Sequence, residues 1–163
     1  MKEQQTNEKV IEVDHIVHDN YEEYIGKNVK VRGIVYLDYL GLTKLPINFT
    51  EVGGDFYCSS NKLTSLEGSP RIVGGNFYCY DNKLTSLVGA PERVGGDFYC
   101  SFNNLTSLEG APEKVGGNFV CRSNELTTLV GAPEKVGRDF YCHDNPLKSS
   151  KGKPESIGGG FKS

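Results

Sequence analysis

The sequence predicts a mostly β solenoid, in which each 21-residue coil adds one short parallel strand and a small cap covers the N-terminal end. Three observations support this fold class. The same residue types recur at a step of 21 through most of the 163-residue chain. Each unit contains a short alternation of apolar and polar residues, which is typical of a strand. Glycine and proline stand at fixed places between the alternations and mark turns. A single coil buries little, so stacking must build the shared core.

The repeat is defined by columns of identical residues. Five full units run 53–73, 74–94, 95–115, 116–136 and 137–157, and a sixth begins at Gly158. The aromatic column is Phe56, Phe77, Phe98, Phe119, Phe140 and Phe161; the thiol column is Cys58, Cys79, Cys100, Cys121 and Cys142; the amide column is Asn61, Asn82, Asn103, Asn124 and Asn145. Columns in register over five units indicate one continuous stack.

The second unit shows how one coil is expected to fold. Phe77 and Cys79 alternate with Tyr78, which places the first two on the inner face of a strand and the tyrosine on the outer face. Asn82 follows the strand, where its amide can satisfy backbone groups in the bend and in the next coil. Leu84 returns to the core. No segment of the unit is long enough for a full helix, so the return path is expected to be extended or a turn of 3₁₀ helix.

The spacing Phe77-x-Cys79-x-x-Asn82-x-Leu84 resembles the leucine-rich-repeat signature, which has apolar residues and an Asn or Cys at these offsets. The chain departs from that signature because Phe and Cys occupy two positions where Leu is usual. Both residues are commonly buried, so the departure is compatible with the fold.

The run GGDFYCSSNKLTSLEGSP at 53–70 is similar to repeats in proteins of large tailed bacteriophages and some bacteria. The resemblance covers about residues 32–161. It implies a right-handed leucine-rich-repeat-like solenoid whose exposed strand face is a recognition surface. A phage copy would imply that the target is a bacterial host protein or an antiviral-defence protein.

One domain is expected, divided into a polar tail (1–9), an N-terminal capping element (10–31), a degenerate first repeat (32–52), five repeats (53–157) and a C-terminal stub (158–163). In the cap, the alternation of Val29, Val31, Val35 and Leu37 predicts a strand over the first coil. The segment 19–22 resembles a capping box that opens a short helix, which Gly26 would end. The alternative is that 10–31 is a separate binding segment. At the other end, the open strand edge predicts a homodimer as an alternative to a capping stub.

Composition excludes several functions. The net charge is −3 without clustered Lys or Arg, so nucleic acid is not an expected partner. No apolar run is long enough to cross a membrane and no secretory signal begins the chain, so a cytoplasmic protein is expected, in the host cytoplasm if it is phage-encoded. The five cysteines form an inward-facing column, which predicts buried thiols and neither a metal site nor a cofactor.

The outer strand face carries the candidate binding residues. Repeated tyrosines indicate an interaction surface, because exposed aromatic stripes are common at interfaces; the alternative is that they only stack on one another. Residues that interrupt the repetition, such as Phe102 and Arg122, have no structural need and favour binding. The expected partner-binding residues are Tyr57, Tyr78, Tyr80, Asp97, Tyr99, Phe102, Arg122, Asp139, Tyr141 and His143.

These features predict a protein–protein interaction module that binds its target through the strand face. With the phage resemblance, the sharper expectation is an inhibitor or adaptor acting on a host or antiviral-defence protein. The alternative is carbohydrate or small-ligand binding by the tyrosines. No enzyme is expected, because no nucleophile with its base is apparent.

Overall fold

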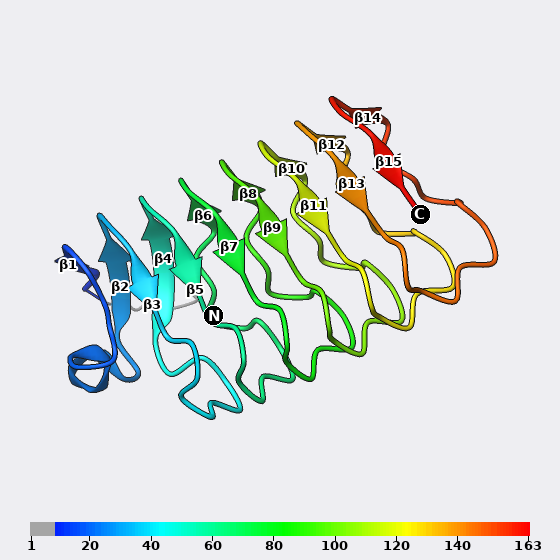
Figure 1. Ribbon diagram of the computed structural model, residues 1–163. Coiled ribbons are helices and arrows are strands. Elements are labelled where there is room, and N and C mark those ends of the chain that lie inside the picture. Colours follow the sequence, from blue (N-terminus) through cyan, green and yellow to red (C-terminus); the bar gives the residue numbers. More distant parts are fainter. Residues whose placement is uncertain (1–8) are drawn as a thin grey trace, which may run out of the picture.

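The computed structural model describes residues 9–163 and consists of two parallel β-sheets that run side by side along a solenoid (Figure 1). The polar tail expected at 1–9 lies outside the described residues except for Lys9. Consecutive strands of each sheet come from consecutive coils, so the sheets record the 21-residue period directly. The mostly β solenoid predicted from the sequence is confirmed.

Within the described part of the chain, the first sheet has eight strands and the second has seven. The first is ordered β1 (Ile11–Val13), β2 (Asn28–Val31), β4 (Asn48–Val52), β6 (Ile72–Val73), β8 (Arg93–Val94), β10 (Lys114–Val115), β12 (Lys135–Val136) and β14 (Ser156–Ile157). The second is ordered β3 (Val35–Tyr36), β5 (Phe56–Tyr57), β7 (Phe77–Tyr78), β9 (Phe98–Tyr99), β11 (Phe119–Val120), β13 (Phe140–Tyr141) and β15 (Phe161–Lys162).

Each regular coil therefore contributes two strands, where the sequence predicted one. The predicted strand is the β7 type, and Phe77 pairs with Phe98 in the next coil. The additional strand is the β6 type, in which Val73 pairs with Val94. It precedes the Gly-Gly pair, has only two residues and shows no alternation, so the pattern of apolar residues does not reveal it.

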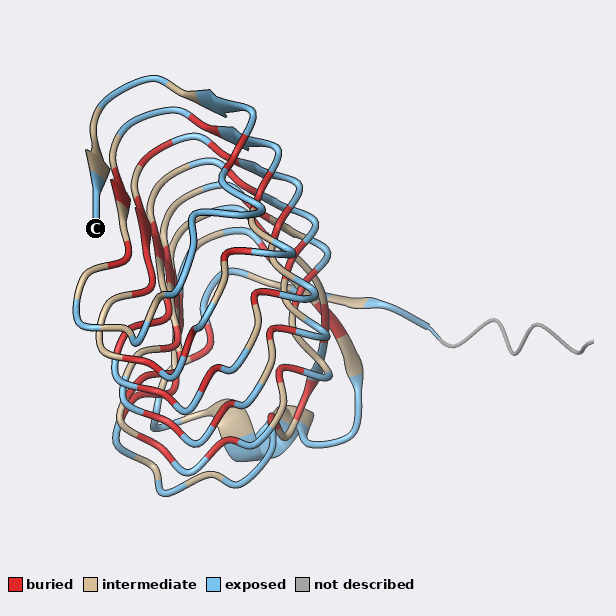
Figure 2. Ribbon diagram, turned by 90° about the vertical axis from the view of Figure 1, so that its right-hand side faces the viewer, coloured by how far each residue is buried: buried red, intermediate tan, exposed pale blue. Residues whose placement is uncertain are grey.

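The core lies between the two sheets and the return loops, as the burial colours of Figure 2 show. The phenylalanines stack face to face through the molecule, with ring centroids 5.1 Å apart at Phe56–Phe77 and 5.3 Å apart at Phe98–Phe119. Phe49 closes this column at its N-terminal end with an edge-on contact to Phe56 at 5.0 Å. The ladder places one large apolar side chain per coil in the shared core.

The glycine that starts each regular coil is required by the distance between neighbouring backbones. A Cβ atom on Gly95 would lie 2.2 Å from the carbonyl oxygen of Gly74 in the preceding coil. The same close approach, at 2.1 Å, occurs between Gly116 and Gly95. No side chain fits at this position, so the Gly-Gly pair fixes how closely the coils stack.

The N-terminal segment packs on the first coil but differs from the prediction in two respects. The alternating segment forms two strands in different sheets, β2 and β3, where one strand was expected. The short helix is a 3₁₀ turn, Tyr21–Tyr24, and the expected capping box is absent from it. The amide oxygen of Asn20 accepts a hydrogen bond from the Val17 N–H at 2.8 Å, so it does not cap the helix. Gly26 follows with φ +73°, as expected of a residue that ends a helix.

Candidate functional site

The outer face of the second sheet carries a ladder of tyrosines, which most of its coils supply. Tyr57 and Tyr78 have ring centroids 4.7 Å apart with planes within 9°, and Tyr78 and Tyr99 are 5.1 Å apart within 8°. Tyr36 extends the ladder with a tilted contact to Tyr57 at 5.3 Å. These tyrosines are half-buried, because each covers the ring face of its neighbour. Much of the tyrosine surface expected to be exposed is therefore used inside the molecule.

The tyrosine hydroxyls are held by the adjacent acidic column. The hydroxyl of Tyr99 donates to Asp97 at 3.0 Å, and that of Tyr57 donates to Asp55 at the same distance. Burial and, next, this hydrogen bond to a carboxylate raise the pKa of Tyr57 and of Tyr99 to about 12. The tyrosines are therefore protonated donors at neutral pH.

The acidic column is itself part of the stack. Asp97 accepts a hydrogen bond from the backbone N–H of Asn118 at 2.6 Å, and Asn76 accepts one from the N–H of Asp97 at 2.7 Å. Asp139 accepts hydrogen bonds from the backbone N–H of Gly160 and from the hydroxyl of Tyr141, and both bonds lower the pKa of its carboxyl group. Asp97 and Asp139, expected to face a partner, thus have structural bonds that link successive coils.

The ladder is interrupted at one coil, where Val120 replaces tyrosine. Val120 is 8% exposed and forms the floor between Tyr99 and Tyr141. A hollow of about 280 Å³ opens there, lined by Tyr99, Tyr141, Asn118, Val120, Arg122 and His143. We call this hollow the Val120 gap.

A second, more apolar hollow of about 210 Å³ adjoins the Val120 gap. The two share Tyr99, Val120 and Arg122. The lining residues of the second hollow are Tyr80, Tyr99, Ser101, Phe102, Val120 and Arg122. The interruptions of the repeat that the sequence singled out therefore surround one place on the strand face.

Phe102 is exposed in a backbone conformation that disfavours it. Its φ is +55° and 49% of its surface is accessible. The equivalent positions in the other regular coils have the same positive φ but carry serine or aspartate, as at Ser60 and Asp81. A non-glycine residue in this region costs about 1–2 kcal/mol, and short polar residues tolerate it best. Tyr39 of the degenerate first repeat stands in the same column as Phe102 and has φ +60°. This correspondence can be found in the sequence, but the predicted binding residues do not include Tyr39.

Arg122 lies beside Phe102, with its guanidinium carbon 4.8 Å from the ring centroid. Within residues 9–163, Arg122 has no carboxylate partner. His143, one coil further, hydrogen-bonds through Nδ1 to the exposed carboxylate of Asp144 at 2.8 Å. The Val120 gap therefore has a positive charge on its rim that the described chain does not neutralise.

The sequence-predicted residues fall into three groups. Those that line the two hollows are Tyr80, Tyr99, Phe102, Arg122, Tyr141 and His143. Tyr57 and Tyr78 lie along the same ladder but on neither hollow, and Asp97 and Asp139 bind backbone N–H groups. Val120, the residue that creates the gap, is absent from the predicted set because a buried valine carries no chemical signal.

The cysteine column is buried, as predicted. All five thiols are free and fully covered. Burial raises the pKa of each thiol above its ordinary value, to about 11 for Cys142. These are poor nucleophiles at neutral pH. Over residues 9–163, no three His, Cys, Asp or Glu side chains gather in a way that would hold a metal ion.

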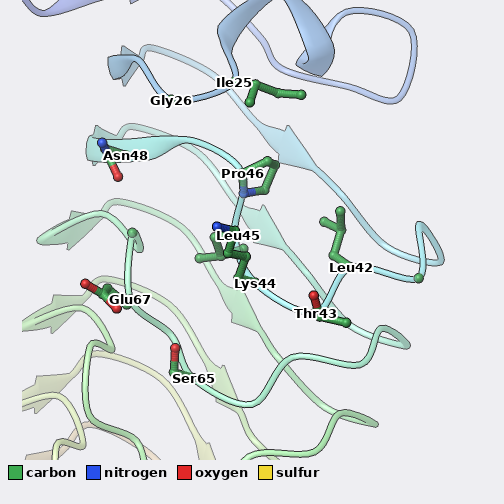
Figure 3. A pocket seen from close by; sticks show the side chains of 12 residues that line it. Ile25, Gly26, Leu42, Thr43, Lys44, Leu45, Pro46, Asn48, Ser65 and Glu67 are labelled. Atoms are coloured by element: carbon green, nitrogen blue, oxygen red, sulfur yellow. The ribbon is translucent and has the colours of Figure 1, made fainter.

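Another hollow, of about 630 Å³, lies at the junction of the cap and the first regular coil (Figure 3). At this junction the degenerate repeat lacks the glycine–proline turn and continues as β4. Its charged lining residues are Lys44 and Glu67. None of the residues that line it is aromatic.

Comparison with known protein families, curated proteins and solved structures finds no match to this chain. Across the described residues 9–163, no helix is long and apolar enough to span a membrane.

Proposed function

We propose that this solenoid is a protein-binding module whose recognition centre is the strand face around the Val120 gap. The observation that carries the proposal is Phe102, an exposed aromatic residue held at positive φ next to the unpaired Arg122. Other regular coils form the same stack with Ser60 or Asp81 in the column of Phe102 and with Ser101 in the column of Arg122, so the stack needs neither side chain. Aromatic residues and arginine are the residue types most enriched at binding hot spots.

The resemblance to bacteriophage repeats supports a sharper version of the proposal. In that version the chain is an inhibitor or adaptor that occupies a surface of a bacterial host or antiviral-defence protein, without catalysis. The fully covered thiols and the internally bonded aspartates favour binding over chemistry.

Carbohydrate binding is a weaker candidate. Sugars pack against the flat faces of aromatic rings, and the ladder covers those faces at Tyr57 and Tyr78. The Val120 gap leaves one face of Tyr99 and one of Tyr141 open, and a protein partner can use these together with the ring edges, so the arrangement suits a protein partner better.

The test is an affinity pull-down from bacterial lysate with two double variants that each restore the repeat consensus. Phe102→Ser/Arg122→Ser introduces serines that other coils carry at these positions, so folding is preserved. The matched control, Val88→Glu/Val130→Glu, changes two exposed valines on the return loops to the glutamate found at Glu67 and Glu109. We expect a partner that wild type and control retain and the strand-face variant loses. Retention by the strand-face variant together with loss by the control would move the recognition surface to the return loops.

A further inference from the structure

The Val120 gap is a missing rung in an otherwise regular aromatic ladder. Below the tyrosines, the phenylalanine ladder passes through this coil without interruption, and Phe119 stacks on Phe98 at 5.3 Å and on Phe140 at 5.2 Å. β11 pairs in register with both neighbours, so the backbone at Val120 is undisturbed. The gap is therefore a side-chain vacancy in an intact coil and has the regular geometry of the ladder.

The vacancy has the dimensions of one aromatic ring. Adjacent strands are about 4.8 Å apart, so Tyr99 and Tyr141, two strands apart, lie about 10 Å from each other. The intact ladder stacks rings at 4.7 and 5.1 Å, so one ring placed midway would stack on both tyrosines. The volume, about 280 Å³, is ample, since about 150 Å³ holds benzene in an apolar cavity.

We propose that the Val120 gap receives one aromatic side chain of the partner protein, stacked between Tyr99 and Tyr141, while Arg122 pairs with a carboxylate beside that ring. The inference rests on the proposed function and names the chemistry of the partner. The parallel rings select a flat group over a branched aliphatic one. The unpaired guanidinium at the rim selects an acidic neighbour by charge complementarity.

The first measurement uses small probes, so that it does not depend on knowing the partner. Backbone amide NMR shifts are followed while wild type is titrated with N-acetyl-L-tyrosine amide, N-acetyl-L-tyrosine or N-acetyl-L-leucine amide. We expect both tyrosine probes to shift residues around Val120 and the leucine probe to have no effect there. The free carboxylate should strengthen binding about threefold, as expected of an exposed ion pair with Arg122. Arg122→Ser should remove this preference.

The decisive variant is Val120→Tyr, which fills the vacancy with the residue that the other regular coils use. It should fold normally and weaken tyrosine-probe binding by about tenfold or more, because the stacking site is occupied. When Tyr78→Val is combined with Val120→Tyr, the vacancy is moved to a coil that lacks Arg122. Ring binding should return there, without preference for the carboxylate.

The outcomes separate this inference from the proposed function. No probe binding to wild type, or equal binding by Val120→Tyr, would overturn the ring-binding inference, whatever the pull-down shows. Failure of the moved vacancy to bind would show that the missing rung is not what recognises a ring. If wild type binds the tyrosine probes but Phe102→Ser/Arg122→Ser captures the partner as well as wild type does, the ring site is retained and the strand face is overturned as the partner surface.

Discussion

Asn103 is bonded to Leu84 in the preceding coil: its amide oxygen accepts the backbone N–H of Leu84 at 3.0 Å. The amide nitrogen of Asn103 donates to the carbonyl of Cys79, also in the preceding coil, at 3.1 Å and to that of Cys100 at 3.2 Å. Asn82, one coil earlier, makes the equivalent bonds to its own preceding coil. The amide column therefore ties each bend to the coil before it, where the sequence suggested the coil after it.

Replacing Asn103 with alanine should lower the free energy of unfolding by about 3 kcal/mol, because it leaves a buried N–H and buried carbonyls without partners. The neighbouring Asn104 is exposed and provides a matched control. Asn104→Ala should change stability by no more than about 0.5 kcal/mol. Urea denaturation of both variants measures the difference; equal losses would mean that the ladder bonds contribute nothing specific.

Gly95→Ala tests the close approach of the coils. The new Cβ would meet the Gly74 carbonyl oxygen at 2.2 Å, and a backbone atom cannot move aside cheaply. We expect a loss of about 3 kcal/mol in the free energy of unfolding. Gly41→Ala is the control, since its φ is +68° but its Cβ meets nothing within 4 Å. It should cost only the conformational strain, about 1–2 kcal/mol. Thermal unfolding that ranks the control as the more damaged variant would contradict this explanation.

Stability should fall at alkaline pH. Burial raises the pKa of the native thiols, such as Cys58 and Cys100, whereas an unfolded thiol loses its proton near pH 8.5. Above that pH the unfolded chain binds fewer protons than the native one, so the free energy of unfolding decreases as pH rises. From about pH 10 the decrease should steepen, because Tyr57 and Tyr99 keep their protons to about pH 12 in the native state.

Urea midpoints at pH 7, 9 and 10 measure this dependence, and absorbance at 295 nm follows tyrosine ionisation. The expected absorbance curve shows Tyr57 and Tyr99 ionising only near pH 12. As an independent check, the thiols of the native protein should resist a disulfide reagent at pH 8 and react once urea unfolds the chain. A midpoint that is constant up to pH 10 would contradict the assigned burial of the thiols.

The period made the fold predictable, since residues such as Phe77 and Phe98 stand in one column and in one parallel register. The second strand was not predictable from the apolar pattern, because Arg93 and Val94 pair through their backbones and bury only the valine. Asp97 was misleading for a related reason. A surface aspartate in a sequence gives no sign that a backbone N–H in the next coil will bind it.

The site was only partly predictable. Interruptions of the repeat led to Phe102 and Arg122, because an unusual residue in a copied position stands out. Val120 interrupts the tyrosine column equally, but its effect is the space it leaves between Tyr99 and Tyr141. That space follows from the stacking of rings across three coils, which is a property of the assembled solenoid.

Substitutions at Phe102 test whether this residue serves partner binding or the stability of the fold. Phe102→Asp places there the residue found at Asp81 and Asp144, which tolerate positive φ better. The substitution relieves the backbone strain at positive φ. It also removes the cation–π contact with Arg122, which contributes about 0.5–1 kcal/mol to the free energy of unfolding. We expect stability to stay the same or rise by up to about 1 kcal/mol, while partner capture in the pull-down falls. A stability loss well beyond the arginine contact would mean that Phe102 serves the fold.

The reverse substitution, Asp81→Phe, completes the comparison. It places an aromatic ring at φ +55° where the residue of the following coil in register with Arg122 is Ser101. Without a cation to contact, the ring should cost about 1 kcal/mol in urea denaturation. Asp81→Phe should also leave partner binding unchanged, because the Val120 gap is untouched. If Asp81→Phe is instead as stable as wild type, the left-handed position accepts aromatic residues freely. The exposure of Phe102 would then no longer argue for a binding role.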